Sequence, residues 1–437
     1  MTQCFFLPMN TWFPNRHQTF IRTLSQHFTL VVHQPGQWAF QGENILDTTD
    51  VVERIGDVTT LLEFQTEWLS YRAFMLQAAE KMLGHALVAD SSASHLENTK
   101  PIVAEALKTA LVLDEMARQT SIDAVVTCTD YTPQARPVIY MAQQLGIPTV
   151  QVEHGLFSTH PYPPPGTEHL SLAPFASNFV ILDNQLEVDI YQRYNLQSSV
   201  KQLLPLGTPL DNATGGVTLS TAAARRRLNI SPGELCVTVG LSWSEPHGPV
   251  ALAAQQAEEV MFVRFVFESV QLIPQKHTVR IFLKLHPAIS NFRSLNAAQN
   301  FYAHLAMQYG LLSQTTILVD GLHDVIAAAD LVVTRTYSSI LWDCIMHDTP
   351  TAFVTPYAWR NVHTPPAPPS SAVADAGLLT YIQRQSEFIQ LIEAVSDSDT
   401  PNDYSQKREA FCQKWEIRSE SPKVKSERIV KWLKEMA

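Results

Sequence analysis

Two basic side chains lie at the end of an apolar run in the second half of the chain. Lys284 and His286 stand at the end of residues 279–285, and Pro287 follows them. Proline lacks a backbone N–H and therefore ends a β-ladder. Side chains alternate along a strand, so Lys284 and His286 are expected on one face. An ammonium and an imidazole at a strand end are suited to bind a nucleotide phosphate or ribose.

Serine-containing segments follow two other apolar runs. Tyr337, Ser338 and Ser339 lead into a predicted helix that carries Asp343 one turn further on. Two hydroxyls, free backbone N–H groups and the positive end of the helix dipole predict an anion site that needs no metal. An ordinary helix cap is the alternative. Ser242, in a Gly-Leu-Ser-Trp-Ser segment, is a further candidate for contact with a donor phosphate, and a simple turn is its alternative.

A third polar segment, in the first half of the chain, follows residues 149–152. Glu153, His154 and Gly155 stand in this order directly after that run. The glycine permits a tight turn and the close approach of a ligand. His154 is a candidate base or oxyanion partner, and Glu153 is a candidate base. A structural histidine at a turn is the alternative.

These segments require an α/β scaffold that places strand ends together. Residues 122–152 read as strand, helix and strand, and the same alternation recurs over residues 235–354. The strands are continuous apolar runs, as expected for parallel sheets covered on both faces. Residues 60–118 contain no strand signal and predict a helical insertion. Over residues 206–216 the alternation of apolar strands and helices is interrupted by a segment that contains glycine and proline, which predicts a domain boundary.

The composition excludes several classes of protein. The 437 residues include 31 Lys and Arg against 42 Asp and Glu, a net charge of −11, which argues against nucleic-acid binding without sequence preference. The five cysteines form no C-x-x-C pair, which argues against a disulfide framework or zinc site and fits a reducing compartment. Signatures of nicotinamide sites, P-loops, zinc proteases and serine hydrolases are absent. With neither a signal peptide nor a long apolar segment, we expect a cytoplasmic protein.

The order of the motifs resembles a group of GT-B glycosyltransferases. His154-Gly155, His286-Pro287 and Tyr337-Ser338-Ser339 with Asp343 follow one another as in bacterial sialyltransferases and polysialyltransferases, Kdo transferases, and CDP-glycerol glycerophosphotransferases of teichoic-acid synthesis. The segment Leu-Gly-Thr-Pro-Leu-Asp at 206–211 is also similar to a segment of this group. The resemblance covers about residues 120–360.

The resemblance implies a fold and a site. The fold would be GT-B: two facing Rossmann-like domains with parallel sheets, a helical insertion in the first, and a C-terminal helix that crosses back. The acceptor domain would span residues 1–215, the donor domain 216–404, and C-terminal helices 405–437. The His-Pro and Ser-Ser motifs would hold a cytidine nucleotide in the second domain, with no metal and no cofactor besides the nucleotide-sugar substrate.

The expected reaction is the inverting transfer of a sugar to a hydroxyl group of a surface glycan such as capsule or lipopolysaccharide. The donor would be a CMP-linked sialic-acid-like or Kdo-type sugar. The alternatives are a glycerophosphotransferase that uses CDP-glycerol, a nucleotide-sugar 2-epimerase, and a non-catalytic nucleotide-binding subunit.

The sequence departs from the group in two places. Thr334-Arg335-Thr336 precedes Tyr337 where the glycerophosphotransferases have Thr-Asp, and no acidic Asp/Glu-Asp/Glu-Gly motif occurs in the first domain. The carboxylates that remain there are Asp130, after residues 122–127, and Glu153. We take Asp130 as the expected general base, with Glu153 and His154 behind it.

The C-terminal segment is basic and amphipathic. Basic residues outnumber acidic ones between Lys407 and Lys434, and a helix over 426–436 would align Ile429, Leu433 and Met436. Such a helix offers peripheral contact with an anionic inner membrane. Packing of this helix onto the first domain is the alternative.

Overall fold

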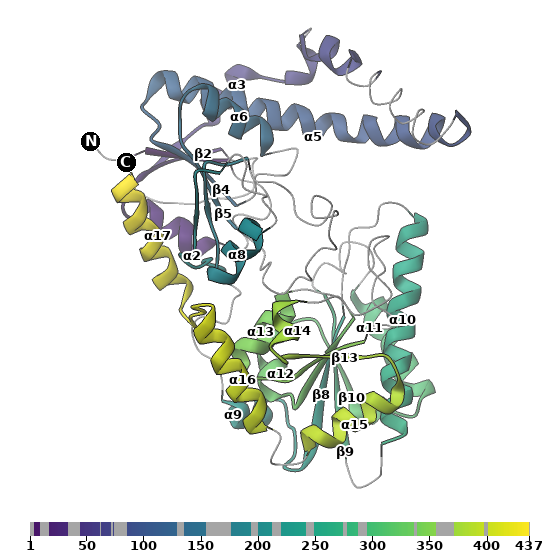
Figure 1. The fold of residues 1–437 in the computed structure, drawn as a ribbon. Helices are drawn as coiled ribbons and strands as arrows, with labels where there is room; N and C mark the ends of the chain where they lie inside the picture. Colours follow the sequence, from purple (N-terminus) through teal and green to yellow (C-terminus); the bar gives the residue numbers. More distant parts are fainter. Residues whose placement is uncertain are drawn as a thin grey trace. The chain divides into compact units, whose positions relative to one another are not determined.

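The computed structural model divides the chain into two compact units (Figure 1). The first comprises the described residues up to 153, residues 176–211 and residues 421–436, and the second comprises those from 220 to 420. The structure describes residues 4–8, 17–33, 44–61, 63–70, 73, 85–128, 135–153, 176–193, 200–211, 220–241, 249–273, 278–286, 295–335, 339–354, 371–396 and 401–436.

The first unit contains a seven-stranded parallel sheet in the order β3-β2-β1-β4-β5-β6-β7. Its strands are β1 (Cys4–Pro8), β2 (Thr29–His33), β3 (Ile45–Asp47), β4 (Ala124–Thr127), β5 (Thr149–Val152), β6 (Phe179–Ile181) and β7 (Gln202–Leu204). Its helices are α2 (Gln18–Ser25), α3 (Thr49–Ile55), α5 (His85–Gln119), α6 (Arg136–Gln144), α8 (Gln185–Arg193) and α17 (Pro422–Met436), with a 3-10 turn η1 (Val58–Thr60). The strand order reverses direction between β1 and β4, as in Rossmann folds.

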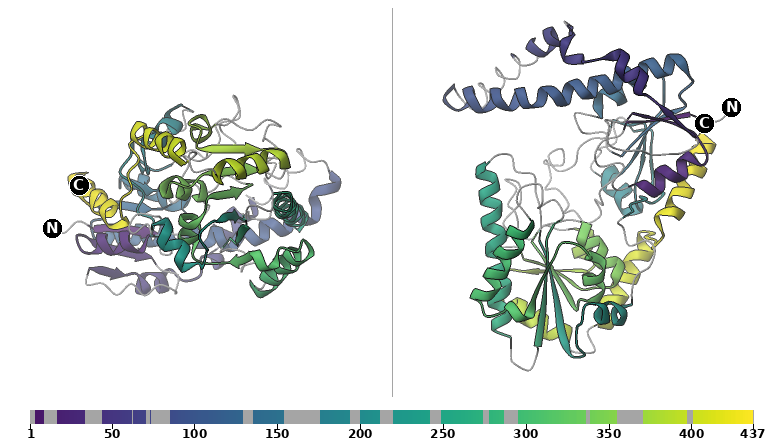
Figure 2. Two further views of the ribbon diagram at one scale, coloured as in Figure 1. Left: turned by 90° about the horizontal axis from the view of Figure 1, so that it is seen from below. Right: turned by 180° about the vertical axis from the view of Figure 1, so that it is seen from behind.

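Alternating side chains of this sheet enter two separate cores. Ala124 and Val126 of β4 pack with α2 and α17, whereas Val125 packs with α5 and α6 on the opposite face. Because both faces are covered, the strands are apolar throughout. The region predicted as a helical insertion contains the 35-residue helix α5, which runs along one side of the unit (Figure 2).

The second unit contains a six-stranded parallel sheet in the order β10-β9-β8-β11-β12-β13. Its strands are β8 (Glu234–Gly240), β9 (Thr278–Lys284), β10 (Thr315–Leu318), β11 (Leu331–Thr334), β12 (Thr351–Val354) and β13 (Leu379–Ile382). Its helices are α9 (Thr221–Arg227), α10 (Pro249–Gln271), α11 (Leu295–Gln308), α12 (Leu322–Ala328), α13 (Ser339–His347), α14 (Ala372–Asp375), α15 (Gln385–Ser396) and α16 (Pro401–Lys414), with a 3-10 turn η4 (Leu312–Gln314). Numbered along this unit, the order is 3-2-1-4-5-6, the Rossmann order.

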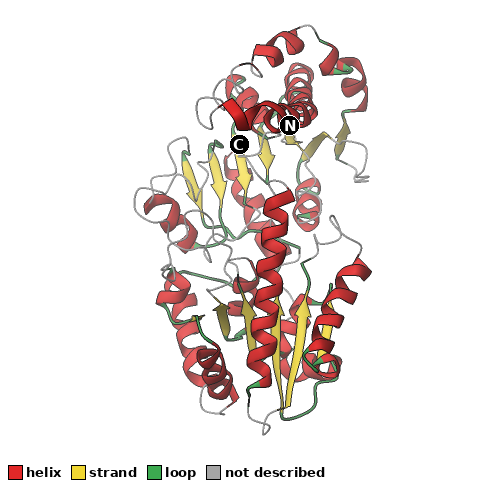
Figure 3. Ribbon diagram, turned by 90° about the vertical axis from the view of Figure 1, so that its right-hand side faces the viewer, coloured by secondary structure: helices red, strands yellow, loops and turns green. Residues whose placement is uncertain are grey.

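Helices cover both faces of this second sheet (Figure 3). Leu283 and Leu285 point into a core that includes Phe262 and Phe267 of α10 and Tyr302 of α11. On the other face, the Thr238 hydroxyl donates to the Val325 carbonyl of α12 at 3.1 Å. The predicted class, two Rossmann-like units with parallel sheets, is therefore confirmed.

The C-terminal segment, treated as one piece in the sequence, is shared between the units. Helix α16 belongs to the second unit, while α17 completes the first. Ile429 and Leu433 of α17 are fully buried in the core of the first unit. The Lys425 ammonium lies 2.6 Å from Asp183 Oδ1, and the Arg428 guanidinium donates to the Leu206 carbonyl at 2.7 Å. The apolar face of this helix is thus occupied by the fold itself.

The segment 206–211 holds these elements together. Gly207 has a φ of +91°, and a Cβ there would lie 2.9 Å from the Lys425 side chain, so only glycine fits. The Thr208 N–H donates to Asp183 at 3.0 Å. The Asp211 carboxylate accepts from the Thr19 N–H in the first turn of α2, at 3.1 and 3.2 Å. This motif therefore has a structural role in the first unit.

Candidate functional site

The carboxyl edge of the second sheet brings three of the predicted segments together. Lys284 pairs with Gly240, and Gly240 pairs with Thr334, so the three residues lie side by side on adjacent strands. The strand order reverses between β8 and β11, which is between Gly240 and Thr334. Open α/β sheets bind their ligands at this point.

Lys284 is held in place at this edge. Only 6% of the residue is exposed, and its ammonium donates to the Leu285 carbonyl at 2.8 Å. Burial lowers the pKa of Lys284, and the Asp320 carboxylate opposes this shift. His286 lies two residues further on and is half-buried. Leu283 points into the opposite core, so the alternation along β9 places Lys284 on the other face.

Helix α13 begins directly beside this row. A Cβ on Gly240 would lie 2.6 Å from Cδ1 of Ile340, in the first turn of α13, so a side chain at position 240 would require the Ile340 side chain to move. Ser339 is the first residue of α13. The N-terminal end of this nine-residue helix, whose first N–H groups have no carbonyl partner within the helix, therefore lies against the end of β8.

Asp343 is a buried carboxylate one turn into the same helix. Its exposed fraction is 7%, and burial raises its pKa to about 7. Within the described ranges, it makes neither a hydrogen bond nor an ion pair. A carboxyl group in this state carries a proton for part of the time at neutral pH.

Arg335 begins a buried polar network on the other face of the sheet. It follows β11 directly and is 2% exposed. Its Nη1 lies 3.4 Å from Glu258 Oε2 and its Nη2 lies 3.9 Å from Glu259 Oε2, both on α10. The Tyr302 hydroxyl of α11 donates to Glu259 Oε1 at 2.5 Å. Burial lowers the pKa of Arg335, and the two glutamates oppose this shift.

Sequence reasoning noted Arg335 only as a departure from an acidic motif. Its partners lie 76, 77 and 33 residues away along the chain, so no local pattern links them. An arginine inside an apolar strand end was the one available signal, because such a cation is buried only when it is paired.

The first unit presents polar residues at the corresponding edge of its own sheet. Glu153, a predicted base, directly follows β5 and is fully buried. One of its carboxylate oxygens accepts from the Gln151 side-chain amide at 2.7 Å, and its N–H donates to the Ile181 carbonyl at 3.0 Å. This arrangement fixes the orientation of the carboxylate.

An acid–imidazole pair at this edge, His33 and Glu105, was not predicted from the sequence. His33 ends β2 and is 2% exposed, and its Nε2 lies 3.6 Å from Glu105 Oε1 on α5. Interaction with His33 lowers the pKa of Glu105. A histidine that closes the apolar run Thr-Leu-Val-Val was the signal that could have identified it.

Several of the predicted site residues have no described position in the structure. They lie outside the described residues: Asp130, His154, Ser242, Pro287, Tyr337 and Ser338. The side chain of Ser339 lies outside them as well. Among the side chains that the structure does describe, no three His, Cys, Asp or Glu residues gather in a metal-binding group.

No protein-family model and no curated protein sequence matches the chain. Solved structures do. S. aureus MnaA with UDP superposes on the chain with a TM-score of 0.53 at 14% sequence identity. A glycosyltransferase from Rickettsia africae superposes with a TM-score of 0.50 at 8% identity. Each match covers 100% of this chain and 98% of the other. A UDP-GlcNAc 2-epimerase from Methanocaldococcus jannaschii superposes with 0.48 and 12% over the full length of both chains.

At such identities the likeness concerns the fold. With the two Rossmann-ordered sheets, it identifies the fold as GT-B, as the sequence predicted.

Proposed function

We propose that the chain is a glycosyltransferase that moves a sugar from a nucleotide donor to an acceptor hydroxyl. The observation that carries the proposal is the row Lys284–Gly240–Thr334 at the reversal point of the second sheet, with α13 beginning beside it. Such an edge offers backbone N–H groups, a helix dipole and a cation to a diphosphate or monophosphate.

In this proposal the donor phosphate lies at the start of α13. Negative charge grows on the phosphate as the bond to the sugar breaks, and donors already in place stabilise it. We assign this role to Ser338, Ser339 and the N–H groups of α13, with His286 and Lys284 beside them. Ser242, Pro287 and Tyr337 would complete the donor site.

The proposed base belongs to the first unit and removes the proton from the acceptor hydroxyl. Asp130 remains our first choice from the sequence, followed by Glu153 and His154. Burial and the hydrogen bond from Gln151 support Glu153, because a base must be held in one orientation to accept the proton in the transition state.

We further propose a CMP-linked sialic-acid-like or Kdo-type donor and a capsule or lipopolysaccharide acceptor, on the strength of the His-Pro and Ser-Ser motifs. The UDP bound to S. aureus MnaA makes uridine the competing nucleotide.

The acceptors of this proposal lie at the cytoplasmic side of the inner membrane. Because the apolar face of α17 is buried, contact with anionic lipids would use its exposed Lys423, Lys431 and Lys434. None of the helices that the structure describes is both long and apolar enough to span a bilayer.

A thermal-shift panel of CMP, CDP, UDP and GDP tests the proposal. A ligand at 100 times its Kd adds about 2.7 kcal/mol to the free energy of unfolding, so binding is visible as a rise in Tm. We expect the largest rise with a cytidine nucleotide. His286→Ala should abolish this rise and lower turnover roughly 100- to 1000-fold, the scale of losing one transition-state donor.

His304→Ala is the matched control, because His304 is an exposed histidine on α11 of the same unit. It should bind nucleotide as the wild type does. The absence of any nucleotide effect on Tm, or normal activity in His286→Ala, would reject the proposed site.

Product analysis separates the alternatives. Consumption of a nucleotide sugar without an acceptor would indicate a 2-epimerase, and release of CMP from CDP-glycerol a glycerophosphotransferase. Nucleotide binding without turnover over a range of acceptors would indicate a non-catalytic subunit.

A further inference from the structure

We propose that Arg335 is a positioning residue for the donor nucleotide, which it serves by locking α10 and α11 against the end of β11. The inference rests on the proposed donor site. Arg335 stands one residue beyond Thr334, at the reversal point of the sheet, so a contact that fixes its side chain also fixes the carboxyl end of β11.

Burial and charge argue that Arg335 acts through its neighbours. The side chain is 3% exposed and faces two carboxylates, Glu258 at 3.4 Å and Glu259 at 3.9 Å. Together the three groups carry a formal charge of −1. A phosphate arriving at this network would meet a negative environment, whereas Lys284 and the start of α13 are on the opposite face of the sheet.

The network joins the three elements that frame the proposed site. Glu258 and Glu259 belong to α10, the helix after β8, and Tyr302 belongs to α11, the helix after β9. Arg335 closes the chain of contacts from β11, because Tyr302 is bonded to Glu259 and Glu259 faces the guanidinium. One buried cation therefore links the elements that follow three neighbouring strands.

The length of α10 before Glu258 explains why this ion pair could affect the donor site. Nine residues of α10, Pro249 to Ala257, precede Glu258. At 1.5 Å per residue they extend about 14 Å beyond the contact. Since Arg335 lies at the carboxyl edge of the sheet, this part of α10 extends past the strand ends (Figure 1). In this proposal it forms a side wall of the donor site.

Removing the cation leaves two carboxylates close together without their counter-charge. Two carboxylates without a counter-charge repel each other and are unfavourable away from water, so we expect α10 to shift away from β11. The expected consequence is weaker nucleotide binding through a displaced wall and a displaced α13 start.

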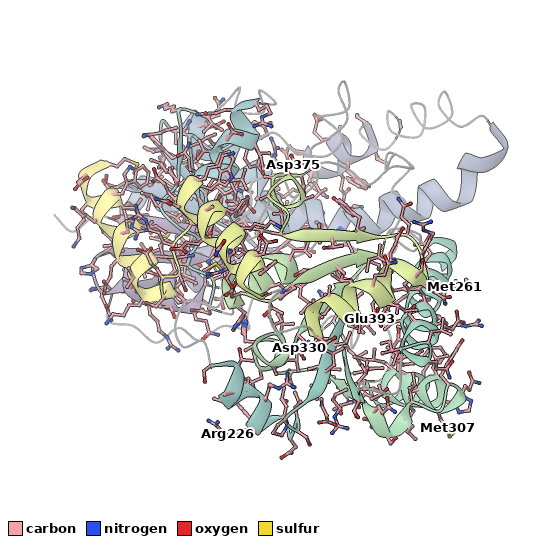
Figure 4. All side chains as sticks on the ribbon, turned by 60° about the horizontal axis from the view of Figure 1, so that its bottom comes forward. Arg226, Met261, Met307, Asp330, Asp375 and Glu393 are labelled. Atoms are coloured by element: carbon pink, nitrogen blue, oxygen red, sulfur yellow. The ribbon has the colours of Figure 1, made fainter. Side chains whose placement is uncertain are left out.

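The test compares Arg335→Met with Arg225→Met in the full chain. Arg225 also forms a part-buried ion pair in the second unit, 3.0 Å from Asp330, but at the opposite edge of the sheet (Asp330 is labelled in Figure 4). The probes are CMP and UDP, with the Kd from calorimetry, the Tm, and hydrogen exchange of peptides from α10 and α11.

We expect Arg335→Met to weaken binding of the preferred nucleotide about tenfold or more, the usual scale for residues that support a ligand-binding group. Exchange in α10 and α11 should rise in the absence of nucleotide. Arg225→Met should lower the Tm while leaving the Kd within about twofold. Tyr302→Phe, which removes only the hydroxyl of the network, should weaken binding in the same direction by a smaller factor.

Arg335→Lys checks the role of geometry. Lysine restores the charge without the planar fork that meets two carboxylates, so it should recover part of the affinity. An unchanged Kd in Arg335→Met, with a wild type that binds nucleotide, would overturn this inference and leave the proposed function standing. A wild type that binds neither nucleotide would overturn both.

Discussion

Two buried ionisable side chains of the second unit differ in how their charge is accommodated. Lys284 is 6% exposed, but its ammonium has the Leu285 carbonyl as an acceptor and Asp320 as a nearby opposite charge. Asp343 is equally buried, and burial alone sets its pKa at about 7. A carboxyl group without a counter-charge costs stability whenever it is ionised.

The pKa of Asp343 predicts a pH dependence with a definite sign. From about pH 4 to pH 7 the folded chain keeps a proton that the unfolded chain has lost, so stability falls as the pH rises and levels off above pH 7. Asp343→Asn should therefore stabilise the protein at pH 8 relative to pH 4.5, by up to about 3 kcal/mol. Urea unfolding at the two pH values measures this difference.

Asp403→Asn is the control for this measurement, because the Asp403 side chain on α16 is 68% exposed. It should show little difference between the two pH values. An Asp343→Asn effect of equal size at pH 4.5 and pH 8 would show that the carboxyl group does not titrate as proposed.

At the scale of elements, α12 and α13 meet through a pair of histidine rings. His323 of α12 and His347 of α13 lie with ring centroids 5.6 Å apart. Burial lowers the pKa of His347 to about 4, with further contributions from His323 and Arg408 and an opposing one from Asp324. The packing of these two helices therefore depends on a neutral imidazole.

Acid should loosen this contact. Between about pH 6.5 and pH 4 the unfolded chain binds a proton at His347 that the folded chain does not. The free energy of unfolding therefore decreases as the pH falls through this range. His347→Gln should show a shallower loss of Tm over this range than the wild type. His304→Gln, on the exposed side of α11, should keep the wild-type slope. A wild-type slope in His347→Gln would contradict the prediction.

At the scale of the whole molecule, the chain returns to complete the unit in which it began. Helix α17 places Ile429, Val430 and Leu433 in a core built from β1, β2 and β4. Lys425 and Arg428 bind the segments at Asp183 and Leu206. The first unit therefore lacks part of its core until the last residues of the chain are in place.

Leu433→Ala should destabilise the first unit by about 2–5 kcal/mol, the cost of a large-to-small change at a buried position. Val424→Ala, on the same helix but 44% exposed, should change stability by less than about 0.5 kcal/mol. Urea unfolding followed by far-UV circular dichroism compares them. Equal effects of the two variants would show that α17 does not belong to the core.

Local patterns in the sequence were sufficient for much of the scaffold. The predicted alternation over residues 235–354 contains strands β8 to β12, because parallel strands buried on both faces are short, continuous apolar runs. The short strands β3, β6 and β7, with three residues each, carry too little pattern to be recognised.

The sequence by itself determined the α/β class, the two runs of alternating elements and the strand ends that carry Lys284 and Glu153, since each depends on neighbours within a few residues. Only the tertiary structure decided that Lys284, Gly240 and Thr334 form one row and that Arg335 is enclosed by Glu258 and Glu259. The physical reason is that strand order and buried ion pairs are contacts between residues tens to hundreds of positions apart. Apolar strands gain free energy when both contacting surfaces leave the water, and a buried charge is tolerated only when its partner lies beside it. A local pattern records neither condition.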